Sequence, residues 1–180
     1  NLDIVWIVKN IDDTNFPSKV RKVKIYSLKY FYEMATAKIW INNSRFPLFV
    51  RKRKKQCYIN TWHGGLGLKK IEQDAIDKLS DYYKKSAPHD SSMIDVMISN
   101  SKYRTNLFKK SFWYNGEIYE CGCPRNDIFF KKNVQSEIER KVKGYYKISS
   151  NSKIILYAPT FRLKSDFNYD SIDYNFLINE

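Results

Sequence analysis

The segment Thr61–Lys70, Thr-Trp-His-Gly-Gly-Leu-Gly-Leu-Lys-Lys, combines the residue types that phosphate chemistry needs. It follows a short strand-like run, Cys57–Asn60, and leads into a helical pattern that starts near Leu68. A glycine-rich turn between a strand and a helix gathers backbone N–H groups at the positive end of the helix, and this combination attracts anions. His63 stands where the turn leaves the strand, the usual position for a reacting group in an open α/β sheet. The segment therefore predicts an anion cradle beside a possible base.

Other interpretations of this segment stay open on the residues alone. The glycine spacing fits neither Gly-x-x-x-x-Gly-Lys-Ser/Thr nor Gly-x-Gly-x-x-Gly, so the generic nucleotide loops do not apply. A Trp-His pair at the end of a strand is also commonly a packing feature. The second histidine, His89, lies in a polar stretch at 88–92 that predicts a surface turn.

Composition limits the class of protein and its partners. The chain has 180 residues, of which 43% are hydrophobic, and a formal net charge of +13. A basic surplus of this size suits nucleic acid, an anionic membrane surface or a phosphate-rich substrate. Three cysteines and two histidines predict neither a disulfide framework nor a zinc site, and favour a reducing, cytosolic environment. The basic run Arg51–Lys55 is interpreted as either a solvated loop or a contact with an anionic surface.

Strand-like and helix-like patterns alternate along the chain, which predicts an α/β fold with a mostly parallel sheet. Ser27 and Ser101 are suitable N-cap residues for two of the helices. The polar stretch at 149–152 is the best linker candidate. Strands are expected at 2–8 (buried on both faces), 20–26, 39–41, 57–60, 93–98, 117–120 and 153–157, and helices at 28–38, from near 68 to 85, at 102–112 and at 134–146.

Five short motifs follow one another in a specific order: Ala35–Lys38, Asn42–Arg45, Thr61–Gly64, Gly122–Asp127 and Tyr157–Arg162. Together they resemble the CDP-glycerol glycerophosphotransferase family, the enzymes that prime and polymerise teichoic acids and similar capsule polymers. The resemblance runs over most of the chain. The family's common form Trp-His-Gly-Thr-Pro-Leu-Lys is replaced by a loop one residue longer, which leaves the identity of the acceptor open.

The resemblance implies a two-domain GT-B architecture built from Rossmann-type units. Residues 1–149 would form the acceptor-side domain, incomplete at its start, and residues 150–180 would begin the domain that binds the CDP part of the donor. The donor-side motifs expected further along, a second histidine and an Asp-Ser-Ser turn, are not found, and the chain by itself is therefore expected to be poorly active or inactive.

The resemblance also implies a reaction, in which an acceptor hydroxyl attacks the β-phosphate of CDP-glycerol or a related CDP-polyol and CMP leaves. His63 would be the base. Phosphate or acceptor contacts are assigned to the glycine loop, its two lysines and the loops that follow two strands: Gly64, Gly65, Gly67, Lys69, Lys70, Arg125, Asn126, Asp127, Thr160 and Arg162. Asn126 and Asp127 are alternatively caps of the helix that follows Pro124. No cofactor and no metal ligand are predicted, and metal dependence stays open.

The predicted partners are the CDP-polyol donor, a lipid-linked polymer acceptor and the anionic cytoplasmic face of the membrane, with the protein bound there as a peripheral enzyme. A GT-B glycosyltransferase that uses a nucleotide sugar is the alternative within the same class. A basic, non-enzymatic module that binds nucleic acid is the alternative from another class. Nucleic acid is disfavoured because the lysines and arginines are spread along the chain without an RNP, KH or helix-turn-helix pattern.

Overall fold

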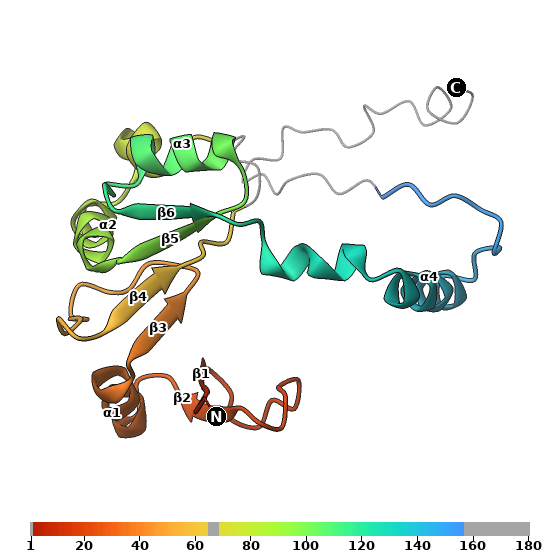
Figure 1. Cartoon of the computed structure of the whole chain (residues 1–180), viewed down its shortest axis with the longest axis horizontal. Coiled ribbons are helices and arrows are strands. Elements are labelled where there is room, and N and C mark those ends of the chain that lie inside the picture. The colour runs from red at the N-terminus through yellow and green to blue at the C-terminus, as the bar shows by residue number, and fades with distance from the viewer. Residues whose placement is uncertain (1, 65–68, 157–180) are drawn as a thin grey trace. The chain divides into compact units, whose positions relative to one another are not determined.

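A computed structural model describes residues 2–64 and 69–156, and Figure 1 shows the course of the chain. The chain divides into two compact units, Asn1–Phe130 and Lys131–Glu180, and each is described by itself. No helix within the described residues is long and apolar enough to cross a membrane. The strands are β1 (Val5–Val8), β2 (Arg21–Lys24), β3 (Ile39–Asn42), β4 (Cys57–Asn60), β5 (Val96–Ser99) and β6 (Glu117–Glu120); the helices are α1 (Leu28–Thr36), α2 (Asp81–Met93), α3 (Lys102–Ser111) and α4 (Lys132–Tyr145), with 3-10 segments at Glu72–Lys78 and Pro124–Phe130.

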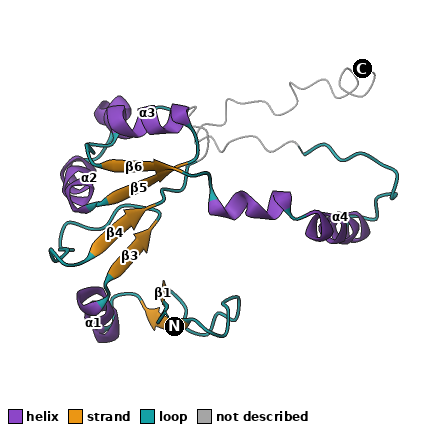
Figure 2. Cartoon of the chain, viewed as in Figure 1, coloured by secondary structure: helices purple, strands orange, loops and turns teal. Residues whose placement is uncertain are grey.

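The larger sheet has four strands in the order β3-β4-β5-β6, and every pair is parallel (Figure 2). A second sheet pairs β1 with β2, also in parallel. The predicted α/β class with a parallel sheet is therefore confirmed. Parallel strands place all their carboxyl ends at one edge of the sheet, and reacting groups of α/β proteins collect at this edge.

The core lies around the four-stranded sheet and α3, which packs on β5 and β6 (Figure 1). Its most deeply buried side chains include Tyr58, Met97, Phe108 of α3 and Phe112, which caps that helix, and none of them exposes a measurable fraction of its surface. The two phenylalanine rings meet edge to face with centroids 4.7 Å apart. The predicted caps are confirmed, since the hydroxyls of Ser27 and Ser101 accept the backbone N–H groups of Tyr30 and Arg104.

The region after the glycine turn folds differently from the prediction. The helix expected from near Leu68 to 85 is replaced by a kinked 3-10 segment at Glu72–Lys78, and α2 begins only after Ser80. The predicted turn at 88–92 is wrong, because these residues belong to α2 and Pro88 lies inside the helix. Proline removes a helical hydrogen bond, but buried contacts of the residues that follow it hold the helix in place.

Two predicted strands also differ. β1 forms, but it is not buried on both faces, since the indole of Trp6 is 52% exposed in a sheet of only two strands. Residues 153–156 are described as an unpaired segment in which Ile155 and Leu156 are exposed. Within the described residues of the second unit there is no strand with which this apolar run could pair.

Candidate functional site

The carboxyl edge of the larger sheet brings together loops that are distant in the sequence. Asn42 and Asn60 are register partners at the ends of β3 and β4, and the backbone N–H of Thr61 continues the pairing by donating to the Asn42 carbonyl over 2.9 Å. His63 follows three residues after the end of β4, and the loop after β6 carries Arg125 to the same place.

His63 has an exposed imidazole whose tautomer is set by one contact. Its Nδ1 lies 2.6 Å from the backbone carbonyl oxygen of Asn43. A carbonyl oxygen can only accept a hydrogen bond, so Nδ1 must carry the proton. The neutral ring then keeps a lone pair on Nε2, which is the form that a general base requires.

Trp62 supports the imidazole from one side. The two rings stack with centroids 4.4 Å apart and an angle of 29° between their planes. Trp62 has a left-handed backbone, with φ of 52°, and its N–H donates to the Asn60 side-chain oxygen over 2.8 Å. This bond stabilises a conformation that a tryptophan rarely adopts. A Cβ on Gly64 would stand 3.4 Å from the indole nitrogen, in ordinary van der Waals contact, so the residue after His63 lies directly beside the stack.

Asn60 also fixes the loop that supplies the carbonyl. It is fully buried, and its amide nitrogen donates to the Ser44 carbonyl over 3.0 Å and to the Tyr58 hydroxyl over 2.9 Å. From the neighbouring strand, Asn42 accepts the backbone N–H of Asn43 and donates to the same Ser44 carbonyl. Asn42 thus positions Asn43, whose carbonyl contacts the imidazole, and Asn60 positions Trp62, the residue before His63.

Behind Trp62 lies a buried guanidinium. Arg45 donates to Glu72 over 2.7 Å, to Asp90 over 3.1 Å, to the Ser91 hydroxyl over 2.7 Å and to the Phe112 carbonyl over 3.4 Å. Its carbon Cζ also stands 5.4 Å from the centre of the Trp62 ring, within the range of a cation–π contact. The side chains of both acidic partners are at most 3% exposed. Arg45 therefore ties the loop after β3 to the 3-10 segment, to α2 and to the tryptophan that supports His63.

The acidic partners of Arg45 accept further hydrogen bonds. Asp90 accepts the backbone N–H of Phe46 and the hydroxyl of Tyr58, while Glu72 accepts the hydroxyl of Tyr83. Burial raises the pKa of the Asp90 carboxyl, against the opposing effect of its hydrogen bonds. Burial and the nearby Asp90 charge raise the pKa of the Tyr58 hydroxyl, which keeps it a neutral donor. The network is internally satisfied, apart from Arg45 Nε, which has no described partner.

Among the predicted site residues that the structure describes beyond the glycine turn, Arg125 contacts His63. Its guanidinium donates to the His63 carbonyl over 3.2 Å and, through Nε, to the Cys123 sulfur over 3.2 Å. Asn126 and Asp127 are exposed in the 3-10 segment that begins at Pro124. Gly64 lies beside Trp62, whereas Lys69 and Lys70 are exposed just before the 3-10 segment at Glu72–Lys78. Four predicted residues lie outside the described residues: Gly65, Gly67, Thr160 and Arg162.

The predicted cradle changes in one respect. A seven-residue 3-10 segment stands where the sequence predicted an α-helix, and its first residue, Glu72, points its carboxylate into the Arg45 network. Within the described residues, the glycine turn is therefore followed by exposed lysines and a 3-10 segment rather than by the N-terminus of an α-helix.

His89 is not a residue of a surface turn. It lies half-buried in α2, where its Nε2 is 2.9 Å from the Val50 carbonyl oxygen and close to Arg51. Within the described residues, no group of three or more His, Cys, Asp or Glu is arranged to hold a metal ion.

The sequence places Asn42–Arg45 in a motif but indicates no role for these residues. It also does not predict that Trp62, Glu72 and Asp90 help to position the His63 segment. The available signal was the pair of asparagines closing two apolar strands, because buried amides at strand ends need specific partners. The contact between Arg45 and Asp90 joins residues 45 positions apart in the sequence, and no local sequence pattern predicts it.

The comparisons with known proteins agree on one family. The family model described as CDP-Glycerol:Poly(glycerophosphate) glycerophosphotransferase matches residues 1–180. A teichoic acid poly(glycerol phosphate) polymerase of Bacillus spizizenii is 35% identical over 98% of this chain and 46% of its own length.

Solved structures of the wall teichoic acid polymerase TagF are similar in fold. One has a TM-score of 0.78 at 33% identity and covers 90% of this chain and 41% of that chain. A histidine-to-asparagine form of TagF soaked with CDPG has a TM-score of 0.78 at 31% identity, over 100% of this chain and 45% of that chain. The GT-B-like α/β class is thus confirmed, and the chain spans less than half the length of these relatives. The chain belongs to the CDP-glycerol:poly(glycerophosphate) glycerophosphotransferase family.

Proposed function

We propose that the protein containing this chain transfers glycerol phosphate, or a related polyol phosphate, from a CDP-polyol to a hydroxyl of a lipid-linked teichoic acid or capsule polymer. Membership of the family and the names of the relatives, among them TagF soaked with CDPG, support the reaction class. The observation that carries the proposal is the His63 imidazole at the carboxyl edge of the sheet, with Nδ1 engaged by the Asn43 carbonyl and Nε2 left as the base.

In this mechanism Nε2 of His63 removes the proton of the acceptor hydroxyl. The hydroxyl oxygen then forms a bond to the β-phosphorus of CDP-glycerol, the bond from that phosphorus to the bridging oxygen breaks, and CMP leaves. Phosphoryl transfer of this kind depends mainly on positioning and on stabilising negative charge. Trp62 and Asn43 provide the positioning, since they fix the plane and the tautomer of the ring.

Charge stabilisation is assigned to cations close to the imidazole. Arg125 is held beside the His63 backbone, and a guanidinium matches the geometry of phosphate oxygens. Lys69 and Lys70 are exposed and add point charges. Gly64, Gly65 and Gly67 would let the backbone approach a phosphate closely, while Asn126, Asp127, Thr160 and Arg162 remain proposed contacts of the donor or acceptor. Residues 150–180 are proposed to begin the donor-binding domain, with residues 1–149 forming the acceptor side.

The cellular location is also proposed. A net charge of +13 favours the anionic cytoplasmic leaflet, where a polymer on a lipid carrier would be extended by a peripheral enzyme. Electrostatic attraction would draw the basic protein to the anionic membrane surface. Salt screens this attraction over a Debye length of about 10 Å at 0.1 M.

The test uses the full-length protein with a glycerol-phosphate-primed lipid acceptor and follows CMP release. Release that requires both CDP-glycerol and the acceptor is the expected result. Release only with CDP-ribitol would change the polyol, and turnover only with a nucleotide sugar would replace the reaction with glycosyl transfer. No CMP release with any donor, together with salt-sensitive binding to arbitrary nucleic acid, would overturn the proposal in favour of a nucleic-acid-binding module.

A further inference from the structure

The basic run Arg51–Lys55 separates into two parts in the structure. Arg51 donates to the Leu48 carbonyl, and Lys52 pairs with Asp95 over 2.8 Å, so both cations serve the fold. The side chains of Arg53, Lys54 and Lys55 are exposed and make no hydrogen bond or ion pair with any other described residue. The side chains of three of the five residues thus have no structural partner within the described part of the chain.

These three cations line a hollow of about 520 Å³ together with Lys38, Gln56 and the end of α1. Lys38 is likewise exposed and unpaired among the described residues. The lining contains four cations and no carboxylate. Like charges gathered without a counter-charge repel one another and raise the free energy of the empty site, and a bound anion relieves this repulsion.

The hollow has a fixed frame. Gln56 is 3% exposed, and its amide nitrogen donates to the carbonyls of Met34 and Ala37 at 2.9 and 2.6 Å. Its side-chain oxygen accepts the backbone N–H of Arg53 over 3.0 Å. The turn that carries the three cations is therefore tied to the end of α1, and both walls of the hollow stay in place when the charged side chains are changed.

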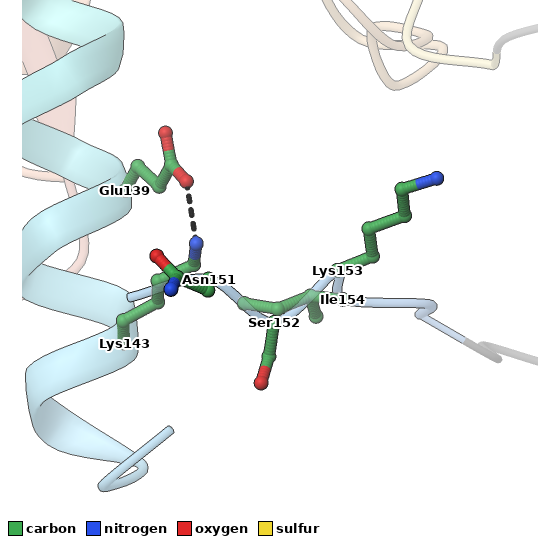
Figure 3. Close-up of a pocket in the computed structure, with 6 residues that line it drawn as sticks. All are labelled: Glu139, Lys143, Asn151, Ser152, Lys153 and Ile154. Atoms are coloured by element: carbon green, nitrogen blue, oxygen red, sulfur yellow. Dashed lines mark ion pairs between the residues drawn. The ribbon is translucent and has the colours of Figure 1, made fainter. Parts of the chain in front are cut away.

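A second hollow shows the contrasting case. It lies between α4 and residues 151–154, and Figure 3 shows Lys143 paired with Glu139 inside it. Lys143 also donates to the Ser150 carbonyl, and Lys153 extends away from this pair in Figure 3. The charge of Lys143 is already neutralised by Glu139, so this hollow has less reason to bind an anion.

The basic hollow and His63 lie at opposite edges of the same sheet. Lys38 and Gln56 directly precede β3 and β4, whereas the imidazole follows the carboxyl end of β4. A strand of four residues at about 3.3 Å per residue separates the edges by roughly 13 Å. A ligand that touches both places must therefore be an extended chain with negative charges at intervals.

We propose that this hollow is a second binding site, which holds phosphodiester groups of the polyol-phosphate polymer at a distance from the reacting end. The inference rests on the proposed function, because that reaction gives the acceptor one negative charge in each repeat. The four cations line a concave surface, and this shape suits a single extended chain better than the flat surface of a membrane. The site would retain long acceptors between additions and would not contact the shortest ones.

The experiment compares two triple variants of the full-length protein that lose the same charge. The first is Arg53→Gln/Lys54→Gln/Lys55→Gln. The control is Lys78→Gln/Lys85→Gln/Lys109→Gln, whose lysines are also exposed and unpaired among the described residues. Binding of a labelled poly(glycerol phosphate) oligomer is measured by fluorescence anisotropy, which needs no turnover. CMP release is measured in parallel with a single-repeat acceptor and with a long acceptor.

The first variant is expected to bind the oligomer about tenfold more weakly, in line with the loss of three exposed ion pairs. Its KM should rise for the long acceptor and stay within about twofold of wild type for the single-repeat acceptor. Equal loss in both variants, or no loss in either, would overturn the inference. Loss of binding to phosphatidylglycerol vesicles with oligomer binding intact would also overturn it, in favour of lipid headgroups. If no donor supports turnover in the wild type, the proposed function fails, while oligomer binding still decides whether the hollow holds a polyol-phosphate chain.

Discussion

At the scale of single residues, the orientation of the His63 imidazole depends on two neighbouring groups. The Asn43 carbonyl chooses the tautomer, and Trp62 holds the plane of the ring. Asn60 supports both, because it accepts the Trp62 N–H and donates to the Ser44 carbonyl. The His63 imidazole, although it lies on an exposed loop, thus gains a fixed orientation from these buried amide contacts.

Replacing Asn60 with leucine should therefore reduce both stability and turnover. The variant leaves the Trp62 N–H without its partner and removes one of the donors to the Ser44 carbonyl, which costs about 1–3 kcal/mol of unfolding free energy. We expect kcat to fall more than KM rises, since ring orientation matters in the transition state. Urea unfolding and CMP release measure the two effects.

Asn100→Leu is the matched control, because Asn100 follows β5 at the same edge but is exposed. It should change stability by less than about 0.5 kcal/mol. An Asn60→Leu protein with the stability and turnover of wild type would contradict the role given to this residue.

At the scale of elements, Arg45 joins the loop after β3 to α2 and to the 3-10 segment. Arg45→Met keeps much of the side-chain volume but leaves the carboxylates of Glu72 and Asp90 buried without their cation. We expect a loss of about 3–5 kcal/mol at neutral pH, the usual consequence of breaking a buried ion pair from one side. Arg45→Lys should recover little, because one ammonium cannot reproduce the fork of the guanidinium.

Arg21→Met is the control for this substitution. Arg21 also bridges two carboxylates, Asp3 and Glu33, but its side chain is 43% exposed. Exposed pairs contribute about 1 kcal/mol or less, so chemical unfolding should show a small change. Equal losses in the two variants would mean that the Arg45 network is not the element that joins these segments.

The Arg45→Met loss should depend on pH in a defined direction. Burial already raises the pKa of Asp90, and removing the guanidinium raises it further. A carboxyl with a raised pKa in the folded state binds more protons there than in the unfolded chain, so stability falls as pH rises above about 4. The difference between wild type and Arg45→Met should thus be largest at neutral pH and shrink toward pH 4. A difference that grows on acidification would contradict a buried, unpaired carboxylate.

The same elements show what the sequence could predict. Strand runs, serine caps and the chemical position of the Trp-His pair follow from local patterns, and β2 to β6, α1, α3 and α4 lie close to the expected places. The helix across Pro88 could not be predicted, because proline locally favours a break and the side chains of Asp90 and Ser91 in α2 are held by partners distant in the sequence, among them Arg45 and Tyr58. The prediction of a strand at 153–157 differs from the structure for the opposite reason. Its local pattern is strong, but no described neighbour pairs with residues 153–156.

At the scale of the whole molecule, the surplus of positive charge predicts association with anionic surfaces. With a net charge of +13, the full-length protein should sediment with phosphatidylglycerol vesicles at about 0.05 M salt and be released near 0.5 M, where the Debye length is much shorter. Binding to neutral vesicles at the same salt is the control. Equal binding to neutral and anionic vesicles would show that charge does not direct the association.

The central claim is that His63 is the base of glycerol phosphate transfer, and CMP release by histidine variants of the full-length protein tests it most directly. The chain has two histidines, so His89→Asn is a control of identical chemistry in α2, where the imidazole contacts Val50 and Arg51 rather than the His63 segment. We predict that His63→Asn lowers kcat at least about 100-fold, as expected for loss of a general base, with its unfolding transition unchanged and His89→Asn turning over at the wild-type rate. Wild-type turnover by a folded His63→Asn protein would remove His63 from the mechanism.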